Sequence, residues 1–331
     1  MKLGLDLYSV RSQGWSAMEM LDYCHDLGVD VAHFGLNSLG PLVDAHLRAV
    51  KAHADNLGLE IEVGMGSICE TSTSFPSGGP SAVARAREAL HVAEIVGSPV
   101  LRCLLGGHAD RRTEIPLETH IQNCIETLRA VREQAMDLGI MMAMENHTGD
   151  LQGWELKGLV EEAGPEHVGV CLDPGNSVWA GETPLTTFEH LAPYIATSHM
   201  RDTVVWSHPR GVAFQWVALG EGNVEIEALA ERYKAECPGA SFTLEIITGR
   251  PPRILNTMED EYWDAFPNAR ASEFARFERL ARRGLPYRGT MVVVEDGADV
   301  PDAYEEALVA QQRYDAERSV AYARDVLRMG S

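Results

Sequence analysis

Four acidic or imidazole side chains stand at or near the ends of short apolar runs in this sequence. They are Glu145, Asp173, His199 and Glu245, and the runs are 140–144, 168–172, 195–198 and 241–246. Each alone would be a structural polar group, but a charge at a buried strand end is costly unless it is paired or bound to a cation. Three carboxylates and one imidazole, without thiolates, suit Mn, Mg, Co or Zn. If the runs converge, the sequence predicts one divalent-cation site.

The elements that must position these residues repeat along the chain. Mostly continuous apolar runs, typical of strands buried on both faces of a parallel sheet, lie at 2–7, 29–34, 59–63, 100–105, 140–144, 168–172, 195–198 and 241–246. Segments of helical period separate them, at 16–27, 42–57, 81–96, 117–138, 153–163, 185–191 and 224–235. Joints such as Leu138-Gly139-Ile140 indicate a helix end, a glycine cap and then a strand. Eight such units predict a (β/α)8 TIM barrel, in which the loops after the strands carry the functional residues.

The region after Glu245 is not needed to supply strands for this barrel. We expect the eighth outer helix at 271–283 and a long C-terminal helical extension at 300–329. This extension is expected to pack on the barrel or on another subunit. The sequence therefore predicts a single domain over 1–331, with the barrel at about 1–285 and the extension at about 286–331.

Composition narrows the classes of function and location. The formal net charge of −21 argues against nucleic acid, because phosphate binding needs clustered Lys and Arg. No apolar run approaches the roughly 20 residues that span a bilayer, and the first residues do not resemble a signal peptide. Six scattered cysteines without a CxxC pair predict buried, reduced thiols. We expect a cytoplasmic protein with no nucleic-acid or membrane partner.

Four motifs over roughly residues 1–250 carry a resemblance to a known family. They are Glu145-Asn146-His147, Asp173-Pro174-Gly175-Asn176, His199-Met200-Arg201-Asp202 and Leu219-Gly220-Glu221-Gly222. With them the sequence resembles the xylose isomerase-like barrels, known broadly as sugar phosphate isomerases/epimerases. The resemblance implies that Glu145, Asp173, His199 and Glu245 bind one divalent ion, most commonly Mn. It also implies that Glu145 and Glu245 act as an acid/base pair.

This resemblance implies a metal-dependent isomerase or epimerase acting on a keto-sugar or sugar derivative. A carboxylate would remove the proton next to a carbonyl, and the cation would stabilise the enediolate as charge develops. One departure concerns Asp173, because ketose epimerases usually place a substrate-contacting His shortly after this residue. Here Pro174-Gly175-Asn176 follows instead, so those substrate contacts do not carry over.

His147 leaves a second reading open. It is a further candidate base, or else a loop histidine that caps the next helix. One related branch, the large subunits of C-glycoside deglycosidases, eliminates the aglycone of 3-keto-C-glycosides by breaking a C–C bond. Such a subunit would work with a small all-β partner. The remaining alternatives are a metal-free sugar-binding scaffold and an apurinic-site nuclease, whose additional histidine ligands would correspond to His33 and His108.

Several polar and aromatic residues are candidates for contact with a small-molecule carbohydrate. We expect substrate binding from Tyr8, Arg102, Arg201, Trp206 and His208, and Trp216 is a further aromatic candidate. Asp202 is expected either to orient His199 or to pair with Arg201. The chain is expected to form a homo-oligomer, or a hetero-oligomer with a small all-β subunit.

Overall fold

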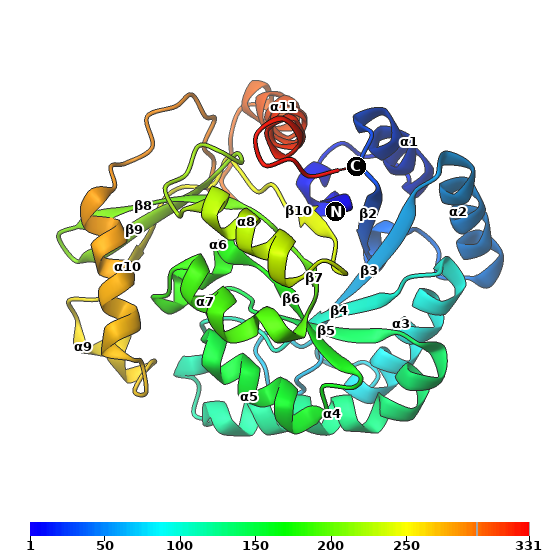
Figure 1. Ribbon diagram of the computed structural model, residues 1–331, viewed down its shortest axis with the longest axis horizontal. Helices are drawn as coiled ribbons and strands as arrows, with labels where there is room; N and C mark the ends of the chain where they lie inside the picture. The colour runs from blue at the N-terminus through cyan, green and yellow to red at the C-terminus, as the bar shows by residue number, and fades with distance from the viewer. Residues whose placement is uncertain (296, 331) are drawn as a thin grey trace.

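The computed structural model describes residues 1–295 and 297–330, and its centre is a barrel of eight parallel strands (Figure 1). The strands are β1 (Leu3–Asp6), β2 (Val31–Gly35), β3 (Glu60–Ser67), β4 (Val100–Leu104), β5 (Met141–Glu145), β6 (Val168–Leu172), β7 (Ile195–Ser198) and β10 (Phe242–Leu244). They follow the order β10-β1-β2-β3-β4-β5-β6-β7. A single parallel bridge from Met200 to Leu244 joins the two ends of the sheet. The predicted TIM barrel is confirmed.

Helices on the outside of the barrel alternate with the strands, as the sequence predicts. They are α1 (Ala17–Leu27), α2 (Asp44–Leu57), α3 (Ala82–Val96), α4 (Leu117–Leu138), α5 (Gly153–Ala163), α7 (Pro184–Leu191) and α8 (Ile226–Glu236), and the short α6 (Pro174–Ser177) follows β6. The predicted glycine joints are real. Gly139, for example, has φ 68°, and its N–H donates to the last turn of α4. A left-handed residue here ends the helix and sends the chain into the next strand.

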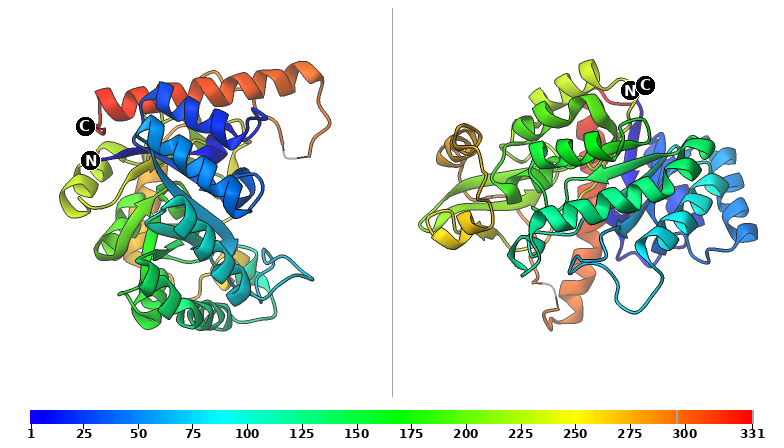
Figure 2. Two further views of the ribbon diagram at one scale, coloured as in Figure 1. Left: turned by 90° about the vertical axis from the view of Figure 1, so that its right-hand side faces the viewer. Right: turned by 90° about the horizontal axis from the view of Figure 1, so that it is seen from below.

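The eighth outer position differs from the prediction. The segment predicted for it forms a helix, α10 (Ala271–Arg283), but α10 packs against a small separate sheet. The position between α8 and α1 is filled by α11 (Asp302–Asp325) (Figure 1). Val320 lies in the main barrel core, and Arg324 donates to the carbonyl of Leu27 at 2.7 Å. The two ends of the chain meet here (Figure 2), where the N–H of Gly330 donates to the carbonyl of Met1.

A small separate sheet follows the seventh strand, and the sequence pattern did not predict it. It consists of β8 (Asp202–His208), β9 (Gly211–Val217) and β11 (Arg253–Leu255), with antiparallel neighbours. With α9 (Asp260–Asp264) and α10 it encloses a second apolar core that includes Phe214, Tyr262 and Phe277. A tight turn at 209–210 joins β8 to β9.

The cysteines and helices agree with two predictions from composition. All six cysteines are buried and unpaired, as expected of reduced thiols. Among the described residues, no helix is both long enough and apolar enough to cross a membrane.

The packing of α11 predicts a stability difference between two valines of this C-terminal segment. Replacing Val320, which is 3% exposed, by Ala should cost roughly 2 kcal/mol of unfolding free energy because buried methyl groups are lost and a cavity remains. The same change at Val326, which is 49% exposed, serves as the matched control and should cost little. Denaturant unfolding of both variants measures the difference. Equal losses would show that α11 is not part of the barrel core.

Candidate functional site

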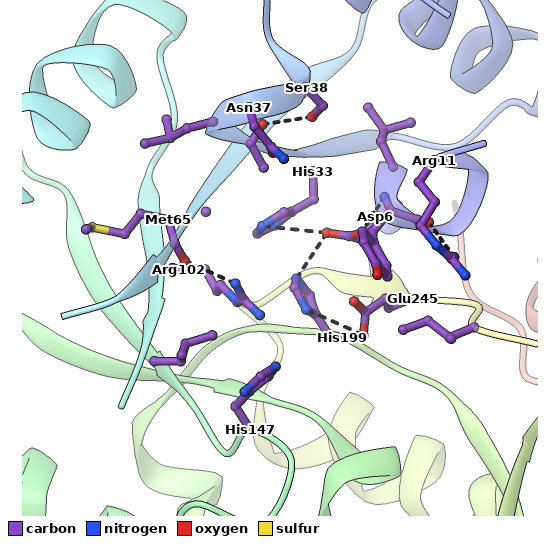
Figure 3. A pocket seen from close by; sticks show the side chains of 18 of the residues that line it. Asp6, Arg11, His33, Asn37, Ser38, Met65, Arg102, His147, His199 and Glu245 are labelled. Atoms are coloured by element: carbon purple, nitrogen blue, oxygen red, sulfur yellow. Dashed lines mark hydrogen bonds and ion pairs between the residues drawn. The ribbon is translucent and has the colours of Figure 1, made fainter. Parts of the chain in front are cut away.

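A cavity of about 1210 Å³ opens at the carboxyl ends of the barrel strands. Asp6, His33, Arg102, His199 and Glu245 line its floor, and each comes from a different strand or from the residue just after one (Figure 3). Because parallel strands all end on the same face, residues far apart in the sequence meet at this point.

The structure brings the four predicted cation ligands together. Atoms of Glu145, Asp173 and Glu245 lie within 4.8 Å of one another, and all three carboxylates are buried. Nδ1 of His199 lies 3.8 Å from Oε2 of Glu145 and 3.9 Å from Oε2 of Glu245. Neither ring nitrogen of His199 has a hydrogen-bond partner among the described residues. Burial lowers the pKa of His199 well below its ordinary value, so the imidazole is neutral, the form that binds metals.

Two buried arginines neutralise much of the negative charge. Arg102 pairs with Glu145. Arg201 pairs with both oxygens of Asp173, and its Nη2 lies 2.5 Å from Oε2 of Glu245. Burial raises the pKa of Glu145, but the nearby positive charges, chiefly that of Arg102, outweigh it and hold this pKa below its ordinary value. Arg102 therefore keeps Glu145 ionised, whereas burial raises the pKa of Asp173 well above its ordinary value, against the opposing charge of Arg201.

Arg201 and Asp202 do not interact as the sequence suggested. Asp202 neither pairs with Arg201 nor orients His199. Its carboxylate accepts hydrogen bonds from the N–H groups of Gly220 and Gly222 at 2.9 and 3.0 Å. Asp202 begins β8, and successive side chains of a strand point to opposite sides. It therefore holds the Gly220–Gly222 turn, whereas Arg201 faces the cavity.

Two asparagines, which the sequence analysis did not assign a role, fasten the carboxylates to the barrel. Asn146 exchanges two hydrogen bonds with the backbone of Asp173, at 2.7 and 2.9 Å. The amide of Asn176 donates to Glu145 at 3.1 Å and to Asp173 at 2.6 Å. Both stand in the quoted motifs, beside the acids that they hold. Gly175 leaves room for Arg201, because a Cβ at this position would lie 2.4 Å from Cγ of that arginine.

His147 points into the cavity with a defined tautomer (Figure 3). Its Nδ1 lies 2.5 Å from the carbonyl oxygen of Gly106. Because a carbonyl only accepts, Nδ1 carries the proton and Nε2 keeps its lone pair. Burial lowers the pKa of His147 below its ordinary value, and the charges of Arg102 and Arg201 lower it further, against an opposing effect of Glu145. The result is a neutral imidazole whose Nε2 can accept a proton.

From the cavity floor, a second group of ionisable residues extends into the barrel. Nε2 of His199 lies 3.4 Å from Oδ2 of Asp6, and Nε2 of His33 lies 3.8 Å from the same oxygen. Nδ1 of His33 lies 3.3 Å from Glu62, which also accepts from Thr197. Burial raises the pKa of Asp6 to about 7. Asp6 and Glu62 were not among the predicted site residues, although both are acids within strand-forming runs.

Aromatic side chains form one wall of the cavity. Trp179, Phe214 and Trp216 line it, and the guanidinium of Arg201 lies 4.6 Å from the ring centroid of Trp216. Of the predicted substrate contacts, Tyr8, Arg102 and Arg201 line the cavity, whereas Trp206 and His208 do not. Those two residues lie toward the turn of the β8–β9 hairpin. His108, considered as a further metal ligand, stacks on Trp179 with ring centroids 5.0 Å apart.

The fold and the arrangement of acids at the strand ends define a member of a known barrel family. The family model described as xylose isomerase-like TIM barrel matches residues 10–265. The chain belongs to this family. Among curated proteins, it is 28% identical over 192 residues to the uncharacterized protein YihM of Escherichia coli (strain K12). That match covers 58% of this chain and about half, 53%, of the relative.

Solved structures share the fold at low sequence identity. A D-psicose 3-epimerase in the presence of D-fructose aligns with a TM-score of 0.63 at 16% identity, covering 99% of both chains. A D-psicose 3-epimerase with D-tagatose from Clostridium cellulolyticum H10 gives 0.59 at 16%, covering 85% of this chain and 96% of that one. The IolI protein with a binding zinc atom gives 0.60 at 14%, covering 85% and 95%. At these identities, the likeness concerns the fold alone.

The shared amide of Asn176 generates a prediction about stability. Asn176→Asp keeps the shape of the side chain but replaces its two donated hydrogen bonds with a third buried carboxylate beside Glu145 and Asp173. We expect a loss of about 2–4 kcal/mol in unfolding free energy. Asn56→Asp, on the exposed face of α2, is the control and should change stability by less than about 0.5 kcal/mol. Denaturant unfolding at pH 7 measures both, and a small loss for N176D would contradict the bridging role.

Proposed function

We propose that this protein is an enzyme that removes a proton next to the carbonyl of a keto-sugar or sugar derivative. One divalent cation, most commonly Mn in barrels of this type, would be held by Glu145, Asp173, His199 and Glu245. The observation that carries the proposal is the convergence of these four side chains beside an open cavity, which His199 and Glu245 line and behind which Glu145 and Asp173 are buried. Isomerisation or epimerisation would follow from where the proton returns.

The residues present fit a divalent cation. His199 is neutral, buried and without a hydrogen-bond partner in the described part of the chain, and three carboxylates supply oxygens around it. A cation would compete with Arg201 for Asp173 and Glu245, since the guanidinium occupies the same oxygens. When bound, the cation supplies Lewis-acid polarisation of a carbonyl.

Proton transfer is assigned to three groups around this floor. Glu145 and Glu245 lie on β5 and after β10, and each has an oxygen within 4 Å of Nδ1 of His199. In this proposal one of them acts as base and the other as acid. His147 is a further base, because its Nε2 is unprotonated while Nδ1 is held by Gly106. Arg102 keeps Glu145 ionised and can also donate to a substrate oxygen.

The aromatic wall and the size of the cavity favour a second candidate reaction. About 1210 Å³ exceeds the 300–1,000 Å³ typical of small-molecule pockets, and Trp179, Phe214 and Trp216 offer flat surfaces for an aromatic group. A sugar carrying an aglycone would use this space. The same proton abstraction, with His147 as base, would then lead to elimination of the aglycone from a 3-keto-C-glycoside, in company with a small all-β subunit.

The metal assignment predicts a clear result for His199→Ala. We expect loss of one Mn per chain, because removing the imidazole leaves only carboxylates that Arg102 and Arg201 already pair. Elemental analysis after dialysis against Mn, with His53→Ala on α2 as the control, measures the bound ion. Binding of as much Mn per chain by H199A as by native protein, at native affinity, would contradict the assignment.

The proton-transfer assignment predicts isotope exchange. In D₂O, the native enzyme with Mn and a ketohexose should incorporate deuterium next to the carbonyl, which NMR detects. Glu145→Gln and Glu245→Gln should slow this exchange about 10²–10⁴-fold, the usual contribution of a general base. Absence of exchange from a panel of ketoses, with release of aglycone from a 3-keto-C-glycoside and dependence on His147, would favour the second candidate. No turnover of either substrate class by the metal-loaded protein would contradict both.

A further inference from the structure

A second cluster of metal-ligating side chains lies outside the cavity, where α7 meets α10. It consists of Glu182, His190 and Glu273, which each offer one ligand atom within 4.8 Å of the others. Glu182 precedes α7, His190 lies in the last turn of α7, and Glu273 lies in the first turn of α10. None of the three lines the central cavity.

The two carboxylates of this cluster are incompletely satisfied. Oε2 of Glu182 accepts from the N–H of Gly153 at 3.0 Å and from Thr187 at 2.8 Å. Its Oε1 has no hydrogen-bond partner in the described part of the chain, although the residue is only 1% exposed. Oε2 of Glu273 is also buried and without such a partner. Buried acceptor oxygens are normally paired, so two orphaned oxygens in one cluster point to an absent positively charged group.

The neighbouring side chains do not complete this cluster. Nε2 of His190 lies 2.9 Å from Oε1 of Glu273, and Arg270 donates to that same Oε1 at 3.2 Å. Both contacts reach the oxygen that is already paired, and neither reaches Oε1 of Glu182. Two carboxylates and one imidazole form a ligand set of zinc sites, with a water molecule as the fourth ligand.

We propose that Glu182, His190 and Glu273 bind a divalent cation of the zinc type, separate from the cation of the central cavity. This ion ties the first turn of α10 to the end of α7. Through α10 it fixes the small sheet β8-β9-β11, whose β9 carries Phe214 and Trp216 of the cavity wall. We assign the site a structural role because it joins two helices and faces no substrate cavity.

Metal titration of chelator-stripped native protein tests the proposal. Zinc at about a hundred times its dissociation constant should raise the melting temperature by roughly 4 °C, with Mn²⁺ as a parallel probe. Glu182→Gln and Glu273→Gln should each lower the bound zinc by one ion per chain and remove this part of the rise. Glu278→Gln is the matched control, because Glu278 lies on α10 like Glu273 but pairs with Arg282 at the surface.

The outcome separates this site from the central one. Variants E182Q and E273Q that bind as much zinc as native protein, with the same rise in melting temperature, would overturn the proposal even if the central site binds metal. Hydrogen exchange in native protein needs no variant. Zinc should slow exchange in residues 271–283, and an unchanged rate there would also overturn it.

Discussion

The candidate site depends on bringing three buried carboxylates together with positive charges beside them. Glu145, Asp173 and Glu245 would repel one another strongly without compensation, since charges interact more strongly in a medium of low dielectric constant. Arg102 and Arg201 supply that compensation through direct pairs. Much of the surrounding structure then follows from the need to place these two guanidiniums, including the glycine at position 175 and the packing of Trp216 against Arg201.

The strand ends could be predicted because their chemistry is local. A polar residue such as Glu145 directly after an apolar run is visible in the sequence. The geometry of a parallel barrel then brings such residues together on one face. The same reasoning gave the strands, the helices between them and the glycine caps. It also gave the four residues around the cavity floor, whose role as metal ligands stays a prediction.

Other features were missed because they depend on partners far away in the sequence. The pairing of Arg201 with Glu245 rather than with its neighbour Asp202 follows from the alternation of side chains around the start of β8. The position of α10 depends on the small sheet, which the sequence pattern did not reveal. Val320 and its neighbours have too many charged residues around them for the pattern to show that α11, rather than α10, completes the ring of helices. Asn146 and Asn176 have no distinguishing pattern in the sequence. They bond to Glu145 and Asp173 because β5 and β6 are neighbours in the barrel.

The charged floor and the aromatic wall of the cavity come from different parts of the structure, because the hairpin β8–β9 supplies part of the wall. The charged floor of the cavity comes from the barrel strands and their first residues, whereas Phe214 and Trp216 of the wall come from a sheet with its own apolar core. A change at Phe214 can therefore reshape the space offered to a ligand while Trp216 keeps its contact with Arg201. In evolutionary terms, such a barrel can acquire new ligands by exchanging an inserted module while the reactive centre is inherited unchanged.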